Sequence, residues 1–120
     1  LDGETRELHI DQALKAIDFD DHEPTFCPAN WSKFNGFSSY LIADQPEIFR
    51  LSHVRMDDPV RLSLPGKGPR LIAVTHNSLA LNSKNITLEL AAGQFALVPA
   101  SAEEVTIQGQ AARFLLTQPA

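Results

Sequence analysis

Short apolar stretches separated by turn residues make up most of the chain and predict β-structure from Phe34 onward. The alternation is clearest in residues 86–90 (ITLEL), where every second residue is apolar and shares one face of a strand. We expect strands near residues 37–42, 47–56, 60–64, 70–75, 78–82, 85–90, 94–98, 103–108 and 111–117. Many short strands with Gly, Pro and Asn between them are typical of a β-sandwich or barrel.

The first 33 residues have a different pattern. Residues 8–17 place Ile10, Ala13, Leu14 and Ile17 at the spacing of one helical face, which predicts a short amphipathic helix. Residues 18–30 carry acids and prolines and predict an extended connector. Its polar cluster is a candidate metal site, but we expect a solvated loop because adjacent residues in a flexible segment rarely converge on one ion. That cluster consists of Asp18, Asp20, Asp21, His22 and Glu23.

Composition narrows the classes of function. A chain of 120 residues can form one domain with a sizeable core, and its formal net charge of −5 argues against nucleic acid or an anionic membrane as a partner. Cys27 is the one cysteine, so an internal disulfide is excluded, and we expect a free buried thiol. No apolar run approaches the length of about 20 residues needed to span a bilayer, so we expect a cytoplasmic protein. The chain starts with Leu1 rather than methionine, and we expect it to be a piece of a longer protein.

The residues that carry chemistry show no visible active centre. None of the four histidines has a second histidine or a glutamate at ligand spacing; His53 and His76 lie on expected strands, and we expect no bound metal there. The glycines and lysine of residues 65–69 (PGKGP) lie between strands and predict a hairpin loop rather than a phosphate site. Glu103 and Glu104, at the start of an expected strand, point to opposite faces and cannot act as an acid/base pair.

One corner of the chain resembles a known motif. Gly93, five residues and Pro99 are similar to the second cupin motif, with Ser101 at its second glycine and Glu104 at its metal-binding histidine. The first cupin motif falls near residues 70–90, where this chain has a single histidine. The resemblance implies a metal-free, mainly β, cupin-like jelly roll preceded by a short N-terminal helix.

A second resemblance covers nearly the whole chain. Residues 2–18 (DGETRELHIDQALKAID) are similar to a segment of type I mannose-6-phosphate isomerases in which RELH introduces a helix of the form xxALxxID. Residues 69–76, 86–100 and 112–116 resemble strands of the C-terminal cupin-like domain of that family, with His76 and Asn77 replacing a Glu-Gly pair. We therefore expect residues 1–33 to be a helix and connector from an upstream catalytic domain, and residues 34–120 to be a C-terminal cupin-like domain.

The resemblance also implies where the chemistry lies. These isomerases interconvert mannose 6-phosphate and fructose 6-phosphate through an enediol, with zinc held by residues upstream of the RELH segment. Arg6, Glu7 and His9 match the structural joint of the family and not its metal shell. We assign no catalytic, cofactor-binding or metal residue, and we expect an inactive fragment whose partner is the upstream domain; zinc and the hexose 6-phosphate belong to the full-length protein.

Two alternatives stay open. One is a stand-alone, metal-free cupin that binds a small sugar or metabolite inside the barrel, with His53, Arg55 and His76 as candidates for its inward face. The other is a metal-free cupin epimerase that uses a histidine and a tyrosine, for which Tyr40 is the single tyrosine available.

Overall fold

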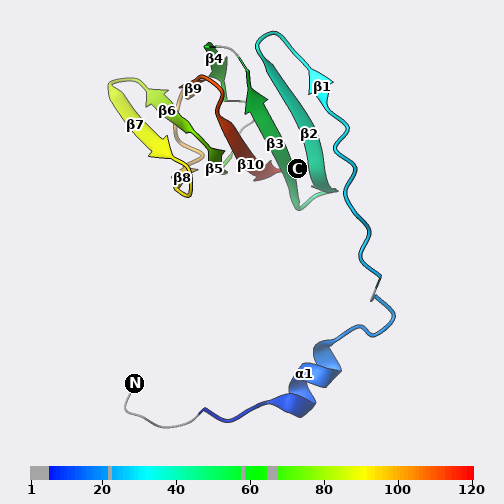
Figure 1. The fold of residues 1–120 in the computed structure, drawn as a ribbon. Coiled ribbons are helices and arrows are strands. Elements are labelled where there is room, and N and C mark those ends of the chain that lie inside the picture. Colours follow the sequence, from blue (N-terminus) through cyan, green and yellow to red (C-terminus); the bar gives the residue numbers. More distant parts are fainter. Residues whose placement is uncertain (1–5, 22, 58, 65–67) are drawn as a thin grey trace.

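The computed structural model describes residues 6–21, 23–57, 59–64 and 68–120. Two antiparallel sheets face each other in a sandwich, and a long arm with one helix precedes them (Figure 1). A mainly β fold of jelly-roll type with a short N-terminal helix, expected from the sequence, is confirmed. Within the described residues, no helix has the length and apolar character needed to cross a membrane.

The larger sheet has six strands in the order β1-β2-β3-β10-β5-β8. These are β1 (Ser32–Lys33), β2 (Phe37–Gln45), β3 (Phe49–Met56), β5 (Arg70–His76), β8 (Phe95–Val98) and β10 (Arg113–Pro119). The last strand, β10, lies between β3 and β5, so segments distant in sequence form the centre of this sheet. A one-residue irregularity after Leu41 shifts the β2–β3 register at Ala43, and a second one lies between Arg113 and Phe114.

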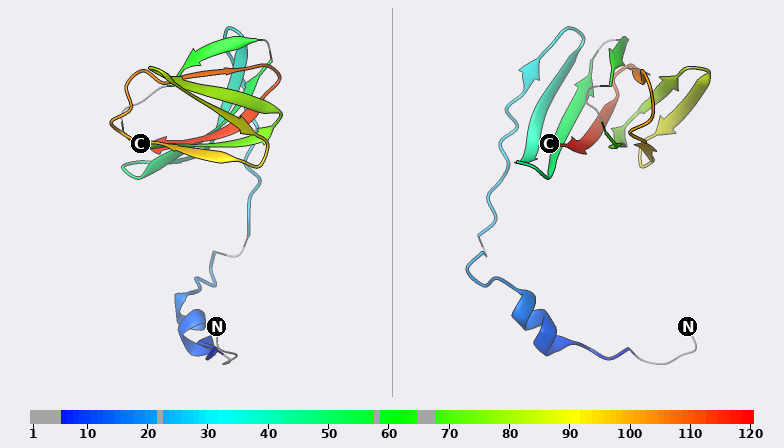
Figure 2. Two further views of the ribbon diagram at one scale, coloured as in Figure 1. Left: turned by 90° about the vertical axis from the view of Figure 1, so that its left-hand side faces the viewer. Right: turned by 180° about the vertical axis from the view of Figure 1, so that it is seen from behind.

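The smaller sheet has four strands in the order β4-β9-β6-β7. They are β4 (Val60–Ser63), β6 (Ser78–Ser83), β7 (Ile86–Ala91) and β9 (Thr106–Gly109). In the left-hand view of Figure 2 the two sheets lie as two layers, one above the other. All nine expected strands occur, and β1, which the sequence pattern did not predict, pairs with β2.

The core lies between the sheets and comes from alternate residues of most strands. Phe114, Met56, Ile72 and Ile107 are its largest fully buried apolar side chains. Turns between strands require special backbone conformations: Gly93 has φ 87° between β7 and β8, and the amide of Gln94 donates to Ala91 O at 3.0 Å. The glycine of the expected motif therefore serves the turn.

The arm contains the expected helix, α1 (Ile10–Ala16), and an extended connector that leads to β1 (Figure 1). No residue of α1 is buried. The acids Asp18, Asp20, Asp21 and Glu23 are exposed, and His22 lies outside the described residues. Pro65, Gly66 and Lys67 of the expected PGKGP hairpin loop also lie outside them.

Candidate functional site

Aromatic and basic side chains gather on the outer face of β2 and β3, where the connector reaches the sheet. The rings of Trp31 and Tyr40 meet edge to face at 4.6 Å, and His53 lies 5.2 Å and 5.4 Å from them. Arg55 places its guanidinium carbon 4.7 Å from the centroid of the Trp31 ring, within the range of a cation–π contact. We call Trp31, Tyr40, His53, Arg55 and the neighbouring Arg113 the aromatic–basic cluster.

Positive charge dominates the electrostatics of this cluster. Burial lowers the pKa of His53 below its ordinary value, and the charges of Arg113 and Arg55 lower it further. Arg55 Nε lies 3.1 Å from Asp57 Oδ1, an ion pair whose geometry is not that of a hydrogen bond. His53 Nδ1 is 3.4 Å from the Tyr40 hydroxyl, and among the described atoms His53 Nε2 is buried without a hydrogen-bond partner. The imidazole is therefore neutral at pH 7 and is held by its neighbours.

The placement of His53, Arg55 and His76 on the inward face of the barrel was wrong. On β3, Val54 and Met56 belong to the core, so His53 and Arg55, which alternate with them, lie on the outer face of the sheet. His76 is exposed at the end of β5, and β10 separates β5 from β3. These three residues therefore do not line the interior.

Tyr40 and His53 are a pair that the sequence did not reveal, because their contact depends on the register of β2 against β3. A histidine and a tyrosine within contact distance are the residues that the epimerase alternative requires. They lie on the outer face of the sheet, away from the cavity between the sheets, so this alternative gains no enclosed site. Trp31 and Arg113 were also missed, since only the strand pairing brings them to His53.

A cavity of about 410 Å³ lies between the sheets, where β2 and β3 face β4 and β9. Its wall is largely apolar, with Phe37, Leu62 and Phe114 among its residues. The polar groups are the hydroxyls of Ser39, Ser52 and Ser63, together with Gln118. Within the described structure, Gln118 Oε1 is buried without a hydrogen-bond partner, so this cavity offers an acceptor to an uncharged ligand.

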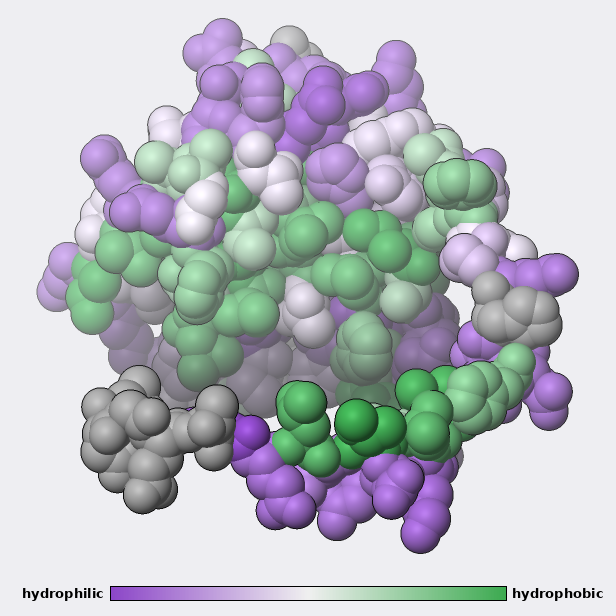
Figure 3. Space-filling view, turned by 60° about the horizontal axis from the view of Figure 1, so that its bottom comes forward, coloured by the Kyte–Doolittle hydropathy of each residue, from purple (hydrophilic) through white to green (hydrophobic). Residues whose placement is uncertain are grey.

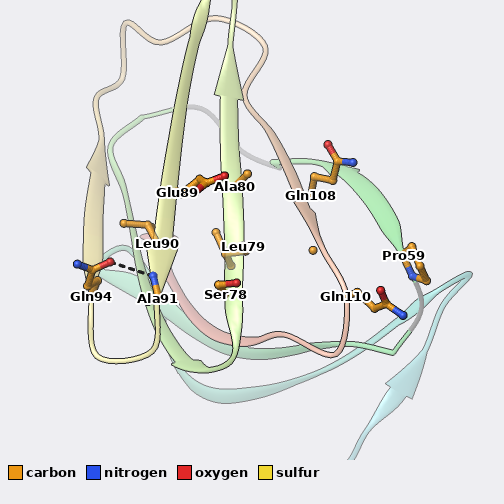
Figure 4. A pocket seen from close by; sticks show the side chains of 11 residues that line it. Pro59, Ser78, Leu79, Ala80, Glu89, Leu90, Ala91, Gln94, Gln108 and Gln110 are labelled. Atoms are coloured by element: carbon orange, nitrogen blue, oxygen red, sulfur yellow. Dashed lines mark hydrogen bonds between the residues drawn. The ribbon is translucent and has the colours of Figure 1, made fainter.

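A second hollow, of about 630 Å³, lies over the smaller sheet (Figure 4). Glu89, Gln94, Gln108 and Gln110 contribute its polar side chains, and Gln94 Oε1 accepts a hydrogen bond from the Ala91 amide at 2.9 Å. Its described lining contains no aromatic ring and no basic side chain, so neither stacking nor anion binding is provided there.

The described residues provide no group of three or more His, Cys, Asp or Glu side chains that could hold a metal ion. Glu104, at the position of a cupin metal ligand, is exposed with φ 38°. Glu103 forms an exposed ion pair with Lys84 at 2.9 Å. Their expected place at the start of a strand was wrong, because β9 begins at Thr106. The donor set needed for a zinc shell is therefore not assembled in the described part of the chain.

Cys27 also differs from the expectation of a buried thiol. It is exposed, and its Sγ lies 3.4 Å from the main-chain oxygen of Ile42, at the irregularity of β2. The connector therefore contacts the sheet through this side chain without covering it.

Comparisons with known proteins place this architecture in a class. No protein-family model matches the chain, and no curated protein matches it. Solved structures of cupins do match: an RmlC-like cupin from Shewanella frigidimarina superposes with a TM-score of 0.68 at 13% identity, covering 83% of this chain and 92% of its own. The cupin domain of Schizosaccharomyces pombe Cnp3 gives a TM-score of 0.65 at 14% identity, with 76% and 68% covered. The chain has a cupin fold.

One of the matching structures is that of a longer protein, an enzyme. Mannose 6-phosphate isomerase from Bacillus subtilis superposes with a TM-score of 0.70 at 18% identity. The match covers 94% of this chain but 35% of that one, so the chain spans about a third of the isomerase. At this identity the likeness shows the fold alone.

Proposed function

We propose that this chain is the C-terminal, non-catalytic domain of a protein of the mannose-6-phosphate isomerase type. The observation that carries the proposal is the extent of the match to the Bacillus subtilis isomerase. Residues 34–120 make up less than three quarters of the chain, so a match covering 94% of it extends well into the arm. The matches to the two cupin structures described above cover less of this chain, 83% and 76%.

The sequence of the arm supports the same assignment. Its DGETRELHIDQALKAID segment resembles the joint that follows the catalytic domain in this family, and the segment contains α1. The resemblance concerns residue identity and the fold match concerns backbone shape, and both favour the same family.

Under this proposal, isomerisation takes place outside the chain. The resemblance assigns zinc and the groups that move the proton to the upstream domain, and the described residues here form no metal shell. The barrel contributes a folded body with an apolar core, to which the arm connects the upstream domain.

The test compares this chain with the full-length protein from which it derives. The full-length protein should convert mannose 6-phosphate to fructose 6-phosphate and contain zinc, whereas residues 1–120 should show neither turnover nor stoichiometric zinc. Turnover by the 120-residue chain, or a full-length protein without isomerase activity, contradicts the proposal.

A second candidate function depends on the cavity between the sheets. Its serine hydroxyls and the unpartnered Gln118 Oε1 suit an uncharged polar ligand such as a free sugar. Titration calorimetry of the chain with mannose, fructose and their 6-phosphates tests this function. Heat with the wild type that is lost in Gln118→Leu supports it, and the absence of heat across the panel contradicts it.

A further inference from the structure

The outer face of the larger sheet is an exposed surface, and cross-strand pairing of β8, β5, β10 and β3 sets its side chains in three rows. One row is apolar at β8 and β5, where Leu97 is 68% exposed and Leu71 is 38% exposed. The middle row begins with Phe95, which is 71% exposed, and continues through Ala73 and Leu115. Large apolar side chains at such exposure mark a surface that another body covers.

The third row is basic. Arg113 and Arg55 are direct cross-strand partners on β10 and β3. Like charges placed directly opposite each other destabilise a sheet. Asp57 neutralises Arg55, but no carboxylate pairs with Arg113 among the described residues. In a chain of net charge −5, this row is a local positive site that a carboxylate from outside complements.

The apolar side of α1 faces the same space. Ile10, Leu14 and Ile17 are 60%, 49% and 51% exposed. Figure 3 shows the hydrophobic side of the arm turned toward a hydrophobic side of the barrel, with its polar side chains directed away. A helix of seven residues with no buried side chain is not stable by itself in water, so a partner on this side is needed to hold it.

We propose that a folded domain encoded upstream in the same protein seats between α1 and the outer face of the larger sheet, and that one of its carboxylates pairs with Arg113. This inference rests on the proposed function and specifies the docking surface and the chemistry of its occupant. The superposed isomerase supports that occupant: it matches the arm and the barrel together, and most of its chain lies outside the match. An arm followed by a barrel thus occurs in the isomerase together with additional chain that can form a further domain.

The experiment measures whether the outer face is covered in the full-length protein. A single cysteine is introduced as Leu97→Cys in a Cys27→Ser background, and its maleimide labelling rate is read by peptide mass spectrometry in the full-length protein and in residues 1–120. Gln108→Cys, exposed on the smaller sheet, is the matched control. We expect labelling at position 97 to be at least about tenfold slower in the full-length protein and labelling at position 108 to be unchanged, since a covered thiol reacts only when the interface opens.

Other outcomes overturn the inference. Equal labelling rates at position 97 in the two proteins, or protection at position 108 instead, show that the upstream domain seats elsewhere. Protection at position 97 that already occurs in residues 1–120 and rises with protein concentration identifies a second copy of the chain as the occupant. None of these labelling rates depends on isomerase activity. The experiment can therefore reject the docking surface while the proposed function stands, and the reverse.

The charge of Arg113 is tested in the same assay. Arg113→Glu should raise the labelling rate at position 97 of the full-length protein by about tenfold, because a carboxylate of the partner then faces a like charge. Arg61→Glu, on β4 of the smaller sheet, is the control and should have no effect. An unchanged rate in Arg113→Glu rejects the carboxylate contact.

Discussion

Side chains of the same type differ widely in how far they are buried in this fold. Phe114 is 1% exposed at the centre of the core, whereas Phe95 is 71% exposed on the outer face of β8. Both lie on strands of the larger sheet. The difference in exposure therefore comes from the face of the sheet on which each ring lies, and not from secondary structure.

Phe114→Ala should lower the free energy of unfolding of the isolated chain by about 3–5 kcal/mol, since it removes a buried ring and leaves a cavity. Phe95→Ala should change it by less than about 1 kcal/mol, because the ring is already in water. Urea denaturation of both variants measures the difference. Equal losses contradict this assignment of the core.

His53 shows how the outer face responds to pH. Its folded-state pKa lies below the ordinary value of 6.5 because of burial, Arg113 and Arg55, while its unfolded-state pKa is unperturbed. Above about pH 6.5 the imidazole is neutral in both states, and stability is lost as the pH falls from there through the lowered folded-state pKa.

Arg113→Gln should raise the pKa of His53 toward 6.5, although not fully to it, since burial is the larger cause. NMR titration of the His53 ring measures this change. Arg61→Gln, whose Nε donates to Thr106 Oγ1 at 3.2 Å on the smaller sheet, should leave the titration unchanged. A His53 pKa that does not move in Arg113→Gln shows that the two charges are not coupled.

The elements differ in how far the sequence predicts them. Residues 86–90 alternate cleanly and form β7, and the spacing in residues 10–17 forms α1. By contrast, β1 has two residues and exists because it pairs with β2, which no local pattern reveals. The strand expected from Glu103 begins at Thr106, because Glu104 adopts a positive φ that extended structure does not allow.

The prediction that His53 and Arg55 face the interior of the barrel was wrong for a related reason. Alternation shows which residues of β3 share a face, but it does not show which face is inside. Leu51 lies with His53 and Arg55, while Ser52 lies with Val54 and Met56, so both sets mix apolar and polar residues. The aromatic–basic cluster then requires strand order and register, which are tertiary information.

At the scale of elements, the arm should be independent of the barrel. Deletion of residues 1–24 should change the Tm of the 120-residue chain by less than about 2 °C, because no residue of α1 is buried and Trp31 is retained. Differential scanning calorimetry measures this. A fall of more than about 5 °C indicates that the arm packs on its own barrel, and it contradicts the proposed seat for an upstream domain.

For the whole molecule, an uncovered apolar face predicts binding of hydrophobic dyes by the folded chain. The isolated chain should enhance ANS fluorescence at pH 7 while retaining a cooperative unfolding transition. The double substitution Phe95→Ser and Leu97→Ser should reduce that fluorescence severalfold, whereas Gln108→Ser should not. A native chain that binds no dye argues that this face is too small to be an interface.

The central position of β10 has a consequence for synthesis. The larger sheet cannot form its middle until residues 113–119 have left the ribosome, because β3 and β5 contact each other only through β10. Until then the nascent chain holds two unpaired strand edges in water, which are templates for association with other chains. This domain is therefore expected to fold late and all at once, after its last strand has been synthesised.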